Sequence, residues 1–175
     1  MAKLEKGLVQ VYTGNGKGKT TAAFGLALRA IGRGLKVYII QFIKGGFDYG
    51  ELYVVDKLPG LELKAFGQGK FITGKPAKED VEQAQQALEL ARQAVNSGKY
   101  DLVVLDEINV ALGLKLIGLD EVLELIELKP AHVELLLTGR GAHDKIVQAA
   151  DLVTEMKDVK HPYNRGVPAR KGIEY

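Results

Sequence analysis

A glycine-rich loop between an expected strand and an expected helix constrains this chain more than any other feature. Residues 13–20 read TGNGKGKT, which follows the P-loop pattern G-x-x-x-x-G-K-[ST] except that Thr13 replaces the first glycine. Residues 8–13 are an apolar run typical of a buried strand, and residues 20–31 carry apolar side chains at helical spacing. Strand, loop and helix in this order predict a nucleotide-binding α/β domain.

Each part of the loop has a physical reason to bind phosphate. Gly14, Gly16 and Gly18 free the backbone to turn its N–H groups inward, and the following helix directs its positive end at the same place. Lys19 adds a positive charge, and Thr20 supplies a hydroxyl to Mg²⁺. We therefore expect ATP here; the alternative is a glycine-rich turn with a surface lysine.

The rest of the chain alternates between strand and helix patterns. Further strands are expected at residues 36–42, 61–66, 101–105, 132–138 and 152–156. Helical patterns cover residues 51–58, 77–96, 120–128 and 144–150, with another stretch from about Ile108. We expect one domain over residues 1–175, with a mostly parallel sheet of about six strands and helices on both faces. Ligands of such sheets bind at the carboxyl ends of the strands.

Acidic residues follow one of these strands. Residues 102–107 read LVVLDE, a Walker B pattern in which an acid after a buried strand holds Mg²⁺ directly or through water. Many buried strands end in aspartate without a metal, but the P-loop upstream favours the functional interpretation. The spacing leaves open whether Asp106 or Glu107 is the closer ligand.

Two loops carry further candidates. Residues 138–141 read TGRG, and a tight glycine turn there could bring Arg140 to phosphate oxygens, although a solvated loop arginine fits equally well. Residues 67–76 form a long loop with several glycines, and such loops are often functional.

Composition excludes several classes of protein. Lys and Arg (24) nearly balance Asp and Glu (22), and a net charge of +2 is too small to suggest a nucleic-acid partner. The chain has no cysteine, and its three histidines lack metal-ligand spacing. No apolar stretch suits a signal peptide or a membrane helix. We expect a cytoplasmic protein without a membrane partner.

The P-loop stretch also resembles a known family. Residues 13–25, TGNGKGKTTAAFG, are similar to the opening of the P-loop ATP:corrinoid adenosyltransferases, which act on cob(I)alamin or cob(I)yrinic acid a,c-diamide. Further matches follow in order: QFIKG at 41–45, VVLDE at 103–107, TGRG at 138–141 with His143, KHP at 160–162, Gly166, and GIEY at 172–175. The resemblance covers nearly the whole chain.

The resemblance implies a function and partners. The family transfers the 5′-deoxyadenosyl group of ATP to the cobalt of a reduced corrinoid and releases triphosphate. Its members have a recombinase-like P-loop fold and work as homodimers with Mg²⁺ or Mn²⁺. They take electrons from a reducing protein such as a flavodoxin. Since Co(I) is itself the nucleophile, no serine, cysteine or histidine has to be activated.

The resemblance also implies roles for individual residues. Lys19 and Arg140 are the expected catalytic groups, Thr20 and Glu107 the metal ligands with Asp106 as a possible third, and Phe71 a corrinoid contact. The ATP-binding residues implied are Gly14, Asn15, Gly16, Lys17, Gly18, Lys19, Thr20, Thr21, Gln41 and Arg140.

Two features depart from the family pattern. Well-known relatives have an N-terminal helical extension that covers the site, for which Met1 to Lys6 is too short. They carry a Phe and a Trp in the loop that corresponds to residues 67–74, whereas here Phe71 remains and there is no Trp. Phe71 could instead anchor the loop in the core. The chain also lacks Asp-x-His-x-x-Gly, so a histidine that replaces the lower cobalt ligand is not expected.

Two other functions remain open on the sequence. A P-loop ATPase or kinase would use Glu107 to orient water or an acceptor and would release ADP. A non-enzymatic binding module would only store or deliver its ligand. The phosphate product formed with and without reduced corrinoid separates these possibilities.

Overall fold

The computed structural model describes residues 4–175 and contains one sheet of six strands. Residues 1–3 lie outside the described part, so the expectation about Met1 to Lys6 falls partly outside it. The strands are β1 Val9–Thr13, β2 Val37–Gln41, β3 Leu61–Ala65, β4 Leu102–Asp106, β5 Glu134–Thr138 and β6 Leu152–Glu155. Their order in the sheet is β3-β2-β4-β5-β1-β6, and every neighbouring pair is parallel.

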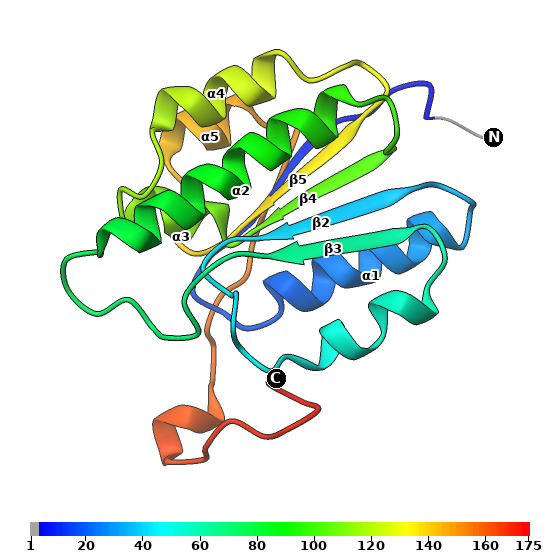
Figure 1. Cartoon of the computed structure of the whole chain (residues 1–175). Helices are drawn as coiled ribbons and strands as arrows, with labels where there is room; N and C mark the ends of the chain where they lie inside the picture. The colour runs from blue at the N-terminus through cyan, green and yellow to red at the C-terminus, as the bar shows by residue number, and fades with distance from the viewer. Residues whose placement is uncertain (1–3) are drawn as a thin grey trace.

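Helices cover both faces of this sheet (Figure 1). The α-helices are α1 Lys19–Ile31, α2 Lys78–Asn96, α3 Ile108–Gly113, α4 Leu119–Glu127 and α5 Asp144–Ala149. The alanines of α1 that recur at helical spacing, Ala23, Ala27 and Ala30, pack on one face of the sheet. Apolar residues of α2, α3, α4 and α5 pack on the other. The predicted fold class is therefore confirmed, and the sheet is entirely parallel.

The expected helix at residues 51–58 is the main difference in secondary structure. The chain forms two short 3₁₀-helices there, Gly50–Tyr53 and Val55–Lys57. Only Val55 and Leu58 of this segment pack against the core, which is too small an apolar stripe to hold a regular helix on the sheet. A third 3₁₀-helix, Pro162–Arg165, interrupts the irregular C-terminal segment.

The strand register brings the sequence motifs to one edge. Gln41 at the end of β2 is paired with Asp106 at the end of β4, and Tyr12 of β1 with Thr138 of β5. The P-loop follows β1 directly. The motifs that are expected to share a site thus lie at the same end of the sheet, where the strands have their carboxyl ends. Within residues 4–175 no helix is long and apolar enough to cross a membrane.

Candidate nucleotide and metal site

The P-loop is held against the segment that follows β6. The backbone N–H of Gly16 donates to the carbonyl of Met156 at 2.7 Å. A Cβ on Gly16 would lie 2.6 Å from the carbonyl oxygen of Lys157, so only glycine permits this approach. Gly18 precedes α1 with φ 116°, a left-handed conformation that also favours glycine. The glycines of the motif therefore have distinct backbone roles.

Lys19 lies inside the loop. Its ammonium donates to the carbonyl oxygens of Gly14 and Gly16, each at 2.7 Å, and the residue is buried. Burial lowers the pKa of Lys19, while the nearby Glu107 carboxylate works in the opposite direction. The ammonium of Lys19 thus lies within the loop that the sequence predicts to bind phosphate.

The Asp106 carboxylate joins four segments of the chain. It is fully buried, and its Oδ1 accepts hydrogen bonds from the hydroxyls of Thr20 at 2.9 Å and Thr138 at 2.7 Å. Its Oδ2 accepts from Lys44 Nζ at 2.8 Å and Gln41 Nε2 at 3.1 Å. These contacts connect the P-loop helix with the ends of β2, β4 and β5.

Lys44 completes this cluster with a buried ion pair. Its Nζ lies 2.8 Å from Asp106 Oδ2 and also donates to Thr20 Oγ1 at 2.9 Å. The ammonium stands 5.3 Å from the centre of the Tyr49 ring. Burial alone lowers the pKa of Lys44, but the Asp106 charge and hydrogen bond outweigh it, so the pKa is raised. Lys44 is therefore charged at neutral pH.

Glu107 lies in a different environment from Asp106. It adopts φ 65°, immediately before α3, and its backbone N–H donates to Thr138 Oγ1 at 3.0 Å. Burial raises the pKa of Glu107, and the Asp106 charge raises it further. The Glu107 side chain lines the nucleotide pocket described next.

A pocket of about 600 Å³ opens in front of the P-loop. Among the predicted site residues, it is lined by Gly16, Lys17, Gly18, Lys19, Thr20, Thr21, Glu107 and Arg140. Asn15 is exposed and does not line the pocket. Gln41 is fully buried behind Asp106, and its Oε1 has no hydrogen-bond partner among residues 4–175. Gln41 is thus placed to support Asp106.

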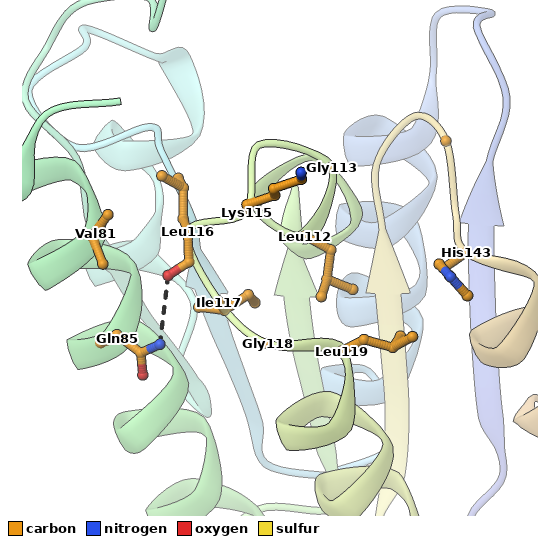
Figure 2. Close-up of a pocket in the computed structure, with 11 residues that line it drawn as sticks. Val81, Gln85, Leu112, Gly113, Lys115, Leu116, Ile117, Gly118, Leu119 and His143 are labelled. Carbon is orange, nitrogen blue, oxygen red and sulfur yellow. Dashed lines mark hydrogen bonds between the residues drawn. The ribbon is translucent and has the colours of Figure 1, made fainter. Parts of the chain in front are cut away.

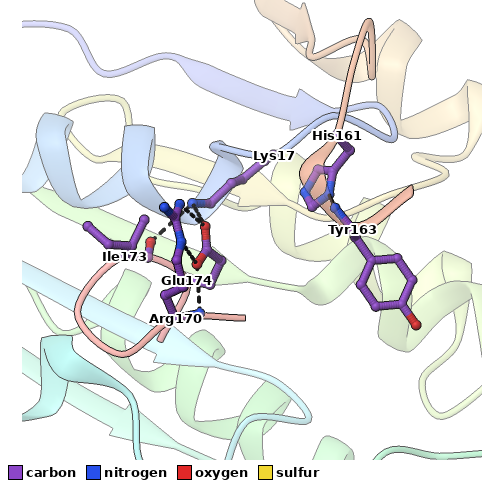
Figure 3. Close-up of polar contacts among 6 residues, drawn as sticks. All are labelled: Lys17, His161, Tyr163, Arg170, Ile173 and Glu174. Atoms are coloured by element: carbon purple, nitrogen blue, oxygen red, sulfur yellow. Dashed lines mark hydrogen bonds and ion pairs between the residues drawn. The ribbon is translucent and has the colours of Figure 1, made fainter. Parts of the chain in front are cut away.

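The C-terminal segment covers one side of this pocket. Lys17 Nζ donates to the Ile173 carbonyl at 3.1 Å and to Glu174 at 3.0 Å, and Arg170 holds the same carboxylate through two side-chain nitrogens (Figure 3). Hydrogen bonds from Arg170 lower the pKa of Glu174 to about 2, so this carboxylate is charged at neutral pH. Lys17 therefore contacts the tail, and Tyr175 beside it lines the pocket.

Phe71 does not anchor its loop in the core. It is 79% exposed, and its ring packs on Phe47 with 5.2 Å between centroids. Phe47 in turn contacts Tyr49, at 5.7 Å, and Tyr49 lines the nucleotide pocket. A row of three aromatic side chains thus runs from Phe71 toward the nucleotide site, with Phe71 available to a ligand.

A second cavity, of about 560 Å³, lies at the same edge of the sheet (Figure 2). Its walls come from α2, from the α3–α4 connection and from the loop after β5, and Gln85 Nε2 donates to the Leu116 carbonyl across it at 3.5 Å. The lining is mainly apolar: Val81, Leu112, Leu116, Ile117 and Leu119. Gly141 lines this cavity and Arg140 the nucleotide pocket, so the two spaces are close neighbours.

The residues at the P-loop fit a magnesium ion that is shared with phosphates. Across residues 4–175, no three His, Cys, Asp or Glu side chains gather to hold a metal by themselves. Mg²⁺, however, commonly takes one or two protein oxygens together with phosphates and water. Thr20 Oγ1 and Asp106 offer such oxygens 2.9 Å apart, and a cation, the Lys44 ammonium, already lies against both.

The sequence did not indicate the contacts of Lys44 and Thr138, or that the C-terminal segment covers one side of the pocket. Lys44 and Thr138 belong to the QFIKG and TGRG motifs, so their position at the ends of strands was a usable signal. The contacts of Lys44 and Thr138 with Asp106 depend on strands far apart in sequence, β2, β4 and β5. Only the strand order brings these residues together.

The chain is similar to known proteins over nearly its whole length. The model of a family described as "ATP:corrinoid adenosyltransferase BtuR/CobO/CobP" matches residues 5–175. A corrinoid adenosyltransferase of Pseudomonas aeruginosa is 40% identical over 99% of this chain and 86% of its own length. Corrinoid adenosyltransferase CobA of Salmonella typhimurium is 37% identical over 99% and 88%. Among solved structures, a RadB recombinase has the same fold, with a TM-score of 0.53 at 13% identity over 91% of this chain and 78% of that one.

Proposed function

The chain belongs to the ATP:corrinoid adenosyltransferase family, and from this premise we propose how its residues perform adenosyl transfer. Its activity is corrinoid adenosylation, a reaction of adenosylcobalamin biosynthesis. The observation that carries our proposal is the pocket that combines Lys19, Lys44 and Arg140 with the P-loop. Three cations and a set of backbone N–H groups suit a polyanionic leaving group.

The reaction needs charge neutralisation more than proton transfer. The electron pair of Co(I) forms the cobalt–carbon bond at the 5′ carbon of ATP. The carbon–oxygen bond there breaks, and its electron pair leaves with the triphosphate. No proton has to move, so the protein's task is to position the two substrates and to stabilise the departing charge. Lys19 from the P-loop and Arg140 from the loop after β5 both line the pocket, so two cations are placed to stabilise that charge.

We propose that Thr20 and Glu107 hold Mg²⁺ or Mn²⁺ together with the phosphates, with Asp106 next to them. When bound, the ion supplies further positive charge to the triphosphate. Asp106 is committed to four hydrogen bonds, whereas Glu107 lines the pocket, which supports Glu107 as the acid nearer to the substrate.

We propose that the corrinoid approaches past Phe71 and places an apolar face toward the second cavity. The exposure of Phe71 and the apolar walls beside the nucleotide pocket support this placement. The homodimer, the electron donor of flavodoxin type and the cytoplasmic location stay predictions that rest on the family resemblance and on the sequence.

The phosphate product tests this mechanism directly. With ATP and chemically reduced Co(I) corrinoid, we expect intact triphosphate in a one-to-one ratio with the adenosylated product, as measured by phosphorus NMR. Without corrinoid, ATP should remain intact, because no nucleophile reaches the 5′ carbon. ADP and orthophosphate formed in step with turnover would contradict the mechanism and support a P-loop ATPase or kinase.

Phe71→Ala is expected to harm reaction from Co(II) corrinoid more than reaction from Co(I). Formation of a reducible Co(II) state requires loss of the lower ligand, and an apolar ring can occupy the vacated face, whereas Co(I) has little need of axial ligands. Initial rates with each substrate measure the effect. Val159→Ala, at a residue that is 91% exposed, is a control for loss of an exposed apolar side chain. Equal losses with Co(II) and Co(I) would mean that Phe71 serves only in packing.

A further inference from the structure

The ammonium of Lys44 lies where a metal ion would be expected. It is 2.9 Å from Thr20 Oγ1 and 2.8 Å from Asp106 Oδ2. Those two residues supply the hydroxyl and carboxylate oxygens that P-loop proteins offer to Mg²⁺. Two cations cannot both occupy the space between these oxygens, since they repel each other strongly at such distances.

We propose that the ammonium of Lys44 occupies the metal position until ATP binds. It then turns toward the triphosphate and pairs with it, which leaves the position to the metal ion. This inference rests on the proposed metal site, in which Thr20 is a ligand and Asp106 lies beside the ion, and adds an order of events. A metal ion that binds without ATP has to break the buried ion pair between Lys44 and Asp106, so its affinity is low. When the metal ion arrives with ATP, the ammonium can pair with the triphosphate instead, so the affinity of the metal ion is higher.

The residues around Lys44 are compatible with two positions of its ammonium, one against Asp106 and one toward a phosphate in the pocket. In the nucleotide-free protein, the buried Asp106 carboxylate needs a full positive charge nearby, because its other partners, Thr20, Thr138 and Gln41, are neutral. Lys44 also lines the nucleotide pocket, with 12% of its side chain exposed. Its four-carbon stem is flexible, so the ammonium can turn toward a phosphate without a backbone shift.

The three lysines near the pocket are not equivalent in this respect. Lys19 is bonded to carbonyl oxygens of its own loop, and Lys17 to the C-terminal segment. Within the described residues, Lys44 is the pocket lysine that forms an ion pair with an acid of the metal site. Of these three lysines, Lys44 is therefore the one whose ammonium competes with a metal ion for Asp106.

Binding of Mn²⁺ to the nucleotide-free protein tests the proposal, with free Mn²⁺ measured by electron paramagnetic resonance. Lys44→Met removes the charge and keeps the length of the side chain. We expect Lys44→Met to bind Mn²⁺ at least about tenfold more tightly than the wild type, because a competing cation has been removed. Lys64→Met, which removes an exposed lysine from β3, should leave Mn²⁺ affinity unchanged.

A second set of variants guards against a folding defect. Lys44→Gln keeps a hydrogen-bond donor for Asp106 while it lacks the charge, and it should also bind Mn²⁺ more tightly. In the double variant Lys44→Met with Asp106→Asn, the gain should disappear. Thermal unfolding gives an independent measurement: Mn²⁺ should raise the melting temperature of Lys44→Met by more than that of the wild type, because it replaces the lost cation.

Folded Lys44→Met and Lys44→Gln proteins that bind Mn²⁺ no more tightly than the wild type would overturn the proposal. These measurements use neither corrinoid nor turnover. A wild-type protein that released ADP would refute the mechanism of adenosyl transfer, while the Mn²⁺ comparison would still decide the role of Lys44.

Discussion

Lys19→Ala is expected to lower kcat/KM for adenosyl transfer by about 10²–10³-fold or more, which is the usual effect of removing one group that stabilises developing charge. Lys19 is the cation placed deepest in the P-loop, where it is bonded to the Gly14 and Gly16 carbonyls. The departing triphosphate gains negative charge as the carbon–oxygen bond breaks, so the loss should fall mainly on the chemical step.

The fold should survive this substitution. Lys19 stands at the start of α1, where alanine is a good helix former, and the carbonyls it leaves belong to a loop that borders an open pocket. Lys19→Met, which keeps the aliphatic stem, separates loss of charge from loss of packing. Lys78→Ala, at an exposed lysine with 85% side-chain exposure, is the matched control and should keep wild-type turnover.

Single-turnover rates with Co(I) corrinoid, together with circular dichroism of each variant, check this prediction. Near-normal turnover in a folded Lys19→Ala protein would refute the phosphate-binding role of the loop. Recovery of activity in Lys19→Met would show that the stem, and not the charge, is what matters.

Glu107→Gln and Asp106→Asn are expected to differ in their effect on stability. Burial raises the pKa of Glu107, so its charged form is disfavoured in the folded protein. A neutral glutamine removes that penalty, and the variant should be at least as stable as the wild type. Its activity should nevertheless need a higher concentration of Mg²⁺, by about tenfold or more, because one charged ligand is lost.

Asp106→Asn should be destabilised by about 3 kcal/mol, since it breaks a buried ion pair and turns one acceptor into a donor. Asp106 Oδ2 accepts from Lys44 and Gln41, and an amide nitrogen at that position would face two donors. Urea denaturation measures the stability of both variants, and Mg²⁺ titration of activity measures their metal requirement.

Glu127→Gln, at an exposed residue of α4, is the control for loss of one carboxylate. An unchanged Mg²⁺ titration in Glu107→Gln would transfer the metal-binding role to Asp106. A strong loss of stability in Glu107→Gln would indicate a structural role for its carboxylate.

The sequence by itself determined the fold class, and it pointed to residues that mostly line one pocket in the structure. The P-loop pattern depends on local requirements: glycine where φ is positive or where another backbone approaches, and a helix start after it. Strand patterns are equally local, because residues 102–105 of β4 are apolar and buried on both faces of the sheet. Such signals can be read without knowledge of any distant contact.

The tertiary structure decided which residues act together. Lys44, Asp106 and Thr138 are separated along the chain, and they meet because β2, β4 and β5 are adjacent in the sheet. The position of Phe71 was likewise open, since an aromatic ring in a loop can be buried or exposed, and packing on Phe47 leaves it 79% exposed. Local patterns specify conformation, whereas the strand order and the packing of loops at the sheet edge fix the contacts between distant side chains.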